Sequence, residues 1–146
     1  SPRLGACRPG DTLEIRGPQG AAFVVDDPPA GPALLIGAGA GITPLLSIYD
    51  DLVARAPAAP VRFLVSAREP SRIYRYDRYR DVLVMRCTAE EPRIDRTFLA
   101  ATLEPLLPDP GARAWLCAPP GFIDRVVDEL IALGVPEAQI RSESYT

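Results

Sequence analysis

The stretch Gly37-Ala38-Gly39-Ala40-Gly41-Ile42-Thr43-Pro44 joins two apolar runs of the sequence. Residues 33–36, before it, predict a buried strand, and the run that begins at Leu45, after it, predicts a helix. Glycines let the backbone approach a ligand closely, and a helix N-terminus offers free N–H groups and the positive end of the helix dipole. The stretch therefore predicts a phosphate-binding turn, with Thr43 as the N-cap of the helix and Pro44 as its first residue.

This glycine spacing leaves a second interpretation open. The glycines run G-x-G-x-G with Ile42 in the sixth position, which departs from the dinucleotide fingerprint G-x-G-x-x-G. No lysine follows, so a Walker-type loop is excluded. A tight strand-to-helix turn, in which small residues serve packing alone, would use the same residues without any ligand.

Outward from this stretch, strand patterns alternate with helical patterns along the chain. Such alternation predicts βαβ units, and hence an α/β fold with a five-stranded parallel sheet flanked by helices, a Rossmann-like arrangement. The expected strands are residues 33–36, 61–66, 82–85, 114–117 and 139–145; the expected helices run from 44 to about 55, within 68–80, over 97–107 and from Pro119-Pro120 to about Gly134.

The first 27 residues follow a different pattern. Residues 12–16 and 23–25 predict two short strands, separated by the turn residues 17–20. Two strands do not hold a sheet by themselves, so they indicate the tail of something larger. Residues 27–32, rich in proline, predict a stiff linker.

Composition excludes several classes of function. The 146 residues fit one domain, and a net charge of -3 without a basic tail argues against a nucleic-acid partner. Because the sequence has no histidine and its three cysteines, Cys7, Cys87 and Cys117, form no C-x-x-C, we expect no metal site. Scattered cysteines indicate reduced thiols, and no signal peptide or long apolar run occurs, so we expect a cytoplasmic protein without a membrane span.

Candidate ligand-binding residues follow the second predicted strand, since ligands of parallel sheets bind beyond the carboxyl ends of the strands. Ser66 and Arg68 come first, and Arg72 lies four positions further on. In dinucleotide folds an arginine here accommodates the 2′-phosphate of NADP, whereas an acid such as Glu69 holds the ribose hydroxyls of NAD. The sequence favours NADP and leaves NAD open; a solvated charged loop is the alternative without a ligand.

The ends of the last two predicted strands carry further candidates. Cys117, followed by a prolyl turn, either faces a ligand through its sulfur or is a small apolar core residue. Nothing would activate it as a nucleophile, because the chain has no histidine. Glu143 and Tyr145 bring an acid and an aromatic ring to the ligand edge, unless they belong to a frayed, solvated terminus.

Together these segments resemble the ferredoxin–NADP reductase family, which includes the flavin-dependent reductases of oxygenases. The similar motifs keep the same order and spacing over nearly the whole chain: P-G-D…G-P-x-G at residues 9–20, G-G-x-G-I-T-P at 37–44, C-G-P-P-x-F at 117–122, and L-G-V-P…E-x-F at 133–145. The family's R-x-Y-S flavin motif does not occur in the sequence.

The resemblance implies an FAD-dependent oxidoreductase that passes a hydride between NADP (or NAD) and FAD, with electrons going on to a ferredoxin, haem or oxygenase partner. In that family the residues matching Cys117 and Glu143 act at the nicotinamide: Cys117 would position it, and Glu143 would orient it or relay protons. The remaining residues implied to bind cofactor are Gly37, Gly39, Ala40, Gly41, Ile42, Thr43, Pro44, Ser66, Arg68, Arg72, Ala118, Pro119, Pro120 and Tyr145, the last near the flavin.

The same resemblance sets the expected domains. Residues 1–31 would be a remnant of the flavin-binding β-barrel with its linker, and residues 32–146 the NAD(P)-binding domain. The chain would then be a fragment or a truncated relative, and its flavin domain would lie in the parent chain or on a partner. Ala118 replaces a family glycine, and its methyl group would push the nicotinamide away. The alternative function is therefore a stand-alone nucleotide-binding module without redox turnover; a structural domain that has lost its ligand is the third hypothesis.

Overall fold

The computed structural model describes residues 2–17, 20–21, 23–25, 27–73, 76–90 and 93–145. Within them, five parallel strands form one sheet in the order β3-β2-β1-β4-β5. This confirms the expected α/β fold with a five-stranded parallel sheet. The strands are β1 (Ala33–Ala38), β2 (Val61–Ala67), β3 (Leu83–Cys87), β4 (Arg113–Ala118) and β5 (Ile140–Ser144).

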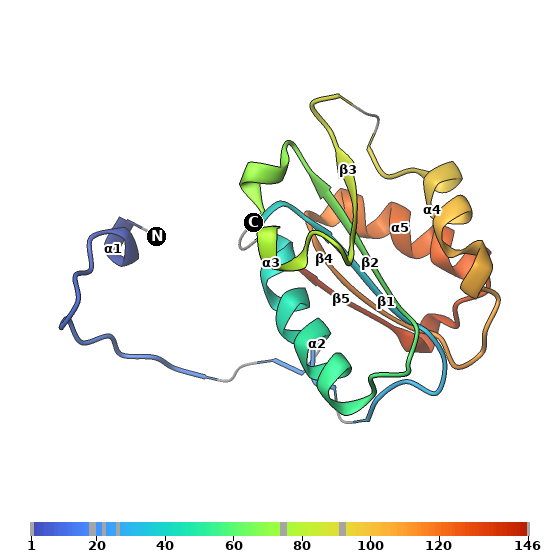
Figure 1. Ribbon diagram of the computed structural model, residues 1–146, viewed down its shortest axis with the longest axis horizontal. Helices are drawn as coiled ribbons and strands as arrows, with labels where there is room; N and C mark the ends of the chain where they lie inside the picture. Colours follow the sequence, from blue (N-terminus) through green and yellow to red (C-terminus); the bar gives the residue numbers. More distant parts are fainter. Residues whose placement is uncertain are drawn as a thin grey trace.

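Helices cover both faces of this sheet (Figure 1). The longest, α2 and α5, lie on opposite faces, α2 together with α3 and α5 together with α4. The helices are α1 (Pro2–Gly5), α2 (Ile42–Arg55), α3 (Tyr76–Tyr79), α4 (Arg96–Leu103) and α5 (Pro120–Ala132), and the 3₁₀ turns are η1 (Gly39–Gly41), η2 (Pro70–Arg72), η3 (Glu104–Leu106) and η4 (Glu137–Gln139).

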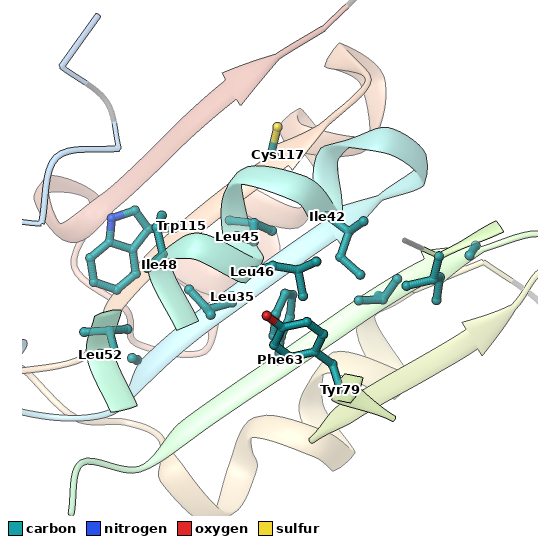
Figure 2. Packing of buried hydrophobic residues seen from close by; sticks show 14 residues of the cluster. Leu35, Ile42, Leu45, Leu46, Ile48, Leu52, Phe63, Tyr79, Trp115 and Cys117 are labelled. Atoms are coloured by element: carbon teal, nitrogen blue, oxygen red, sulfur yellow. The ribbon is translucent and has the colours of Figure 1, made fainter. Parts of the chain in front are cut away.

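The central strand β1 is buried on both faces, which explains its unbroken apolar run. Side chains alternate between faces along a strand, so Leu34 joins the core under α4 and α5 while Leu35 joins the core under α2. Figure 2 shows Leu35 beside Leu45 of α2 and near Trp115 of β4. Two separate apolar cores therefore hold the sheet between its helices.

The strand order creates a switch point between β1 and β4. From β1 the chain crosses to β2 on one side, and β4 is later added on the other side. In open parallel sheets, ligands bind where the strand order reverses, beyond the carboxyl ends of the strands. The glycine loop, defined here as residues 37–44, leaves β1 at this switch point.

The start of α2 differs from the expectation. Gly41 is the N-cap and Ile42 the first helical residue, so Thr43 and Pro44 are the second and third. The reason is that η1 already winds the chain, and Gly41 itself has helical dihedrals, φ -62° and ψ -10°. Pro44 is still tolerated, because the N–H groups of the first turn have no partner within the helix. Thr43 Oγ1 donates to the carbonyl of Ala40 at 2.9 Å and does not cap the helix.

Two further segments differ in their bounds. The helix expected over residues 97–107 is α4 followed by the 3₁₀ turn η3, because Pro105 cannot donate the backbone hydrogen bond that would continue an α-helix. The segment 68–80 holds η2 and α3, as expected, while Tyr74 lies outside the described residues.

The two strands expected near the N-terminus are not formed within the described residues 11–17 and 23–25. The side chains of Leu13 and Ile15 are 51% and 87% exposed, and residues 8–17 extend outside the layered body (Figure 1). A strand needs a partner to pair with, and the described residues offer this segment none. Among the described residues no helix is both long enough and apolar enough to cross a membrane.

Candidate functional site

The segments singled out in the sequence meet at the carboxyl edge of the sheet. β1 lies between β2 and β4, in a register that pairs Ala38 with Ser66 and Gly37 with Cys117. β5 adds Glu143 beside Cys117. The glycine loop and the ends of β2, β4 and β5 therefore lie at one edge, at the switch point of the sheet.

The glycines of the loop serve two different purposes. Gly41 is buried, and a Cβ built on it would lie 1.9 Å from the carbonyl oxygen of Cys117, so this backbone contact admits no side chain. Gly37 is buried within β1, where a Cβ would lie 3.0 Å from Cδ1 of Leu45, so it also serves packing, with a less severe contact. Gly39, by contrast, is exposed with φ +54°, a left-handed conformation that favours glycine. The packing interpretation therefore accounts for two of the glycines. The third exposes its backbone, and phosphate binding by the loop stays a prediction.

Tyr145 lies across the glycine loop. Its hydroxyl donates a hydrogen bond to the carbonyl of Ala38, and its Cε1 lies 3.0 Å from where a Cβ on Gly41 would be. The ring packs against the core under α2 and is half-buried. The residue after β5 is therefore held against the loop after β1, and Tyr145 is an ordered part of this edge.

Cys117 is a buried thiol beside a carboxylate. Its side chain is 6% exposed, and Figure 2 shows the sulfur at the carboxyl end of β4, next to α2. Burial, and after it the negative charge of Glu143, raises the pKa of the Cys117 thiol above its ordinary value. The thiol is therefore neutral near pH 7, which agrees with a positioning role and disfavours a nucleophile.

We expect iodoacetamide to label Cys117 at least about tenfold more slowly than the exposed Cys7 at pH 8, because only an accessible thiolate reacts. The pKa of the Cys117 thiol is higher in the folded chain than in the unfolded chain. The free energy of unfolding should therefore fall as the pH rises from the ordinary thiol pKa to the raised one, because only the unfolded chain then loses the proton readily. Peptide mass spectrometry after timed labelling measures both rates. Equal rates would show that Cys117 is neither buried nor protonated as described.

A cavity of about 440 Å³ opens on the other side of the glycine loop. Three arginines from separate segments line it: Arg68 after β2, Arg93 before α4, and Arg125 in α5. We call it the arginine cavity; its remaining lining residues are Ala38, Gly39, Ser66, Ala67, Thr88, Pro119, Gly121 and Phe122.

The start of α5 contributes to this cavity through its backbone. Pro119 is the N-cap and has no side-chain hydrogen bond to the helix. Pro120 has no N–H, and the Phe122 N–H donates to the Pro119 carbonyl at 3.0 Å, so the Gly121 N–H is what the first turn offers to a ligand. The positive end of the helix dipole adds to the guanidinium charge. An anion is therefore the ligand that the cavity suits, and a phosphate group suits both the arginines and the helix N-terminus.

The structure separates the other expected site residues into three groups. Arg72 lies outside the cavity lining, because its Nε donates to Glu69 Oε1 at 3.0 Å in an exposed ion pair. Ile42 is a core residue under α2. The exposed residues Ala40 and Pro120 adjoin cavity residues in the chain but do not line the cavity, and neither does the exposed Thr43. The half-buried Pro44 lines a different pocket, on the α2 face of the sheet.

Sequence reasoning missed Arg93, Arg125 and Thr88, and it placed Phe122 in the motif at residues 117–122 without giving it a ligand role. Arg125 could have been predicted, since it lies four positions after Gly121, and hence on the same helix face, on a helix that begins at the ligand edge. In the structure its Nε donates to the Gly121 carbonyl at 3.1 Å. Arg93 and Thr88 follow no periodic pattern, because both lie in connections whose course depends on the tertiary fold.

The amino-acid sequence is similar to those of several reductases. No model of a protein family matches the sequence. The reductase component of propane 2-monooxygenase from Mycolicibacterium goodii is 27% identical over 158 residues, 97% of this chain and 45% of that protein. An NADH oxidoreductase of Escherichia coli is 32% identical over 131 residues, 86% of this chain and 40% of that protein.

The fold is similar to that of a solved reductase structure. A ferredoxin–NADP⁺ reductase from Neisseria gonorrhoeae, with bound FAD and NADP, matches with a TM-score of 0.62 at 20% identity, covering 80% of this chain and 57% of that one. The resemblance to ferredoxin–NADP reductases is confirmed. The chain spans less than half the length of the two relatives named above.

One departure from the ferredoxin reductase motif has a different consequence from the one expected. Ala118, in place of the motif's glycine, is fully buried in the core under α4 and α5. Its methyl group therefore points away from Cys117, whose side chain lies on the opposite face. The expectation that this methyl pushes a nicotinamide away is wrong for this geometry.

Proposed function

We propose that this chain is the NAD(P)H-binding portion of a flavin-dependent reductase, which passes electrons onward to a ferredoxin, haem or oxygenase partner. The observation that carries the proposal is the meeting of a glycine loop exposed at Gly39, two helix N-termini and three arginines at the switch point of a parallel sheet. The similarity to oxygenase reductase components supports the same assignment.

The residues present fit a nicotinamide dinucleotide. The arginine cavity has positive charge for the phosphates of the adenosine end, and Gly39 brings backbone close to the path between the two ends. On the other side of the loop, Cys117 offers a neutral, polarisable surface and Glu143 a carboxylate. The dinucleotide would therefore cross the loop, with its adenosine end in the arginine cavity and its nicotinamide near Cys117.

A bound nicotinamide would supply hydride chemistry, with FAD of the complete protein as the acceptor. This chain's residues would position the nicotinamide ring and exclude water from it. Cys117 would hold the ring by contact, and Glu143 would orient the carboxamide of the ring. Tyr145 covers the loop and shields the same edge from solvent. Alignment of two rings is the main contribution that a protein makes to such a transfer.

The flavin site belongs to another part of the protein. We infer that residues 1–31 are the remnant of a flavin-binding barrel with its linker and that residues 32–146 form the NAD(P)-binding domain. The exposed Leu13 and Ile15 support this, since alternating apolar side chains of this kind are the inner face of a strand that packs elsewhere. The scattered cysteines, which form no C-x-x-C, support a reducing compartment, and we place the reductase in the cytoplasm.

The test is calorimetric titration of the purified chain with NADPH and with NADH, after its visible spectrum has been recorded for flavin. We expect saturable binding of at least one nucleotide, with a dissociation constant in about the micromolar to millimolar range. No binding of either nucleotide would overturn the proposal. A stand-alone module is distinguished by adding a flavin domain of a homologous reductase: loss of flavin absorbance on addition of nucleotide supports the reductase, and binding without that loss supports the module.

A further inference from the structure

A second cavity lies on the α2 face of the sheet, beside the starts of β4 and β5. It has a volume of about 400 Å³ and is closed on its other side by part of the segment that precedes β1. We call it the tryptophan cavity; its lining residues are Ala21, Val24, Asp27, Arg113, Trp115 and Arg141. None of them lines the arginine cavity. The tryptophan cavity is therefore separate from the proposed nucleotide site.

The register of the sheet brings three side chains of this cavity together. Trp115 of β4 pairs with Arg141 of β5, and paired residues of neighbouring strands point to the same face of a sheet. Arg113 lies two positions before Trp115 on β4, so it points to that face as well. Its Cζ lies 5.8 Å from the centroid of the indole ring. Two guanidinium groups and an indole ring therefore share one wall of the cavity.

The indole N–H of Trp115 has no hydrogen-bond acceptor among the described residues, although the side chain is fully buried. Figure 2 shows the nitrogen at the end of the ring that faces the N-terminal segment, drawn in blue, and this segment provides the opposite wall of the cavity. Buried donors in folded proteins are nearly always hydrogen-bonded, so each exception requires an explanation. This N–H indicates a ligand that brings an acceptor oxygen into the cavity.

Both arginines keep hydrogen-bond donors for such a ligand. Arg113 donates from Nε to Gln139 Oε1 at 3.1 Å and from Nη1 to the Asp27 carbonyl at 3.2 Å, which leaves Nη2. Arg141 donates from Nη1 to the Ala138 carbonyl at 2.9 Å, which leaves Nε and Nη2. Neither arginine forms an ion pair with a described residue. The free donors of the cavity therefore come from two cations and one neutral N–H.

The charge of the lining selects the class of ligand. Asp27 is the one carboxylate among the described lining residues, so two positive charges face one negative charge. A carboxylate, with a single charge and two acceptor oxygens, balances this lining better than a phosphate, which carries nearly two charges. The exposed Ala21 and Val24 form an apolar rim that is open to solvent, and the buried indole forms the floor. The cavity therefore suits an acid with an apolar body.

We propose that the tryptophan cavity binds the carboxylate of a small organic acid. Arg113 and Arg141 hold the carboxylate, and Trp115 donates its indole N–H to one of the two oxygens. The apolar body of the acid lies against Val24 at the rim. This site goes beyond the proposed nucleotide function and does not depend on it.

The experiment compares benzoate with benzamide, which have nearly the same shape and differ in charge. Trp115 is the one tryptophan of the chain, so selectively excited tryptophan fluorescence reports binding in this cavity. We expect benzoate to change the emission saturably, with a dissociation constant in about the millimolar range, and to bind at least about tenfold more tightly than benzamide. Benzamide that binds as tightly as benzoate, or no saturable change with benzoate, would overturn the carboxylate site.

Two variants test the assigned donors. Arg141→Gln removes a guanidinium from an exposed residue and should weaken benzoate binding at least about fivefold. Trp115→Phe keeps an aromatic ring without the N–H and should weaken binding about three- to tenfold, measured by nuclear magnetic resonance titration because the fluorophore is lost. Arg96→Gln is the matched control for a lost charge, because Arg96 begins α4 on the other face and pairs with Glu129.

The outcomes also separate this site from the proposed function. Unchanged benzoate affinity in Arg141→Gln, or an equal loss in Arg96→Gln, would overturn the proposal. A Trp115→Phe chain with an unchanged far-ultraviolet circular dichroism spectrum and full affinity would overturn it as well. A chain that binds benzoate as expected, but neither NADPH nor NADH, supports the carboxylate site and overturns the nucleotide function alone.

Discussion

A Gly41→Ala substitution is expected to destabilise the fold by about 3 kcal/mol or more, at the upper end of what overpacking one methyl group costs. The added Cβ would lie 1.9 Å from the carbonyl oxygen of Cys117, and the obstacle is backbone, which does not rotate away as a side chain does. Relief would require the glycine loop to move off β4, and with it the hydrogen bond that joins Tyr145 to Ala38. Urea denaturation followed by circular dichroism measures the change.

The matched control for this substitution is Gly121→Ala. A Cβ on Gly121 meets nothing within 4 Å, and the residue lies in the first turn of α5. Alanine there should raise the stability slightly, by up to about 1 kcal/mol, because glycine is the poorer helix former. Similar unfolding midpoints for the two variants would contradict the close backbone contact between the glycine loop and β4.

The second large effect is expected on ligand binding. Gly39→Val should reduce nucleotide affinity at least about a hundredfold, because a β-branched residue is disfavoured at φ +54° and its side chain would occupy the exposed surface of the loop. The Cβ would also lie 2.9 Å from the Tyr145 hydroxyl, so the tyrosine would have to shift. Titration with NADPH and NADH, with circular dichroism to verify folding, measures the loss.

A companion variant separates the two causes of this loss. Gly39→Asn introduces a side chain of similar length, but asparagine adopts the left-handed conformation far more readily than valine. If occupied space is what excludes the nucleotide, both variants lose affinity; if backbone strain is responsible, only valine does. A Gly39→Val chain that is folded and keeps its affinity would show that the glycine loop does not contact the ligand.

The fold was predictable from the sequence because its signals are local. The apolar run of β1 is buried on both faces, as the centre of a parallel sheet requires, and Pro119-Pro120 marks the start of α5 through the missing N–H of proline. The strands expected at 12–16 and 23–25 do not form in the described residues, because strand formation depends on a partner that a local pattern does not provide.

The site was predictable only where it follows a strand. Ser66, near the end of β2, and Arg68, just after it, line the arginine cavity. Arg72 was expected beside them, but its ion pair with Glu69 depends on the turn η2, which sequence spacing alone does not resolve. Arg93 and Arg125 reach the same cavity from segments far apart in the sequence.

The direction of Ala118 could have been inferred. Along β4, Trp115 and Cys117 share one face, and Ala114, Leu116 and Ala118 share the other. Strand alternation therefore places the methyl group of Ala118 opposite the sulfur of Cys117. The two-residue alternation of side chains along β4, and not the difference from the motif, therefore decides what the methyl group of Ala118 contacts.

The bond between Tyr145 and Ala38 has a practical consequence for handling the protein. It fixes the end of β5 against the glycine loop, so any polypeptide attached after residue 145 leaves the body beside the cofactor edge. An affinity tag or fluorescent fusion there would crowd the proposed nucleotide site and bias affinities measured with it. The other end of the chain lies well apart from the sheet (Figure 1), so labels and surface anchors for binding studies belong there.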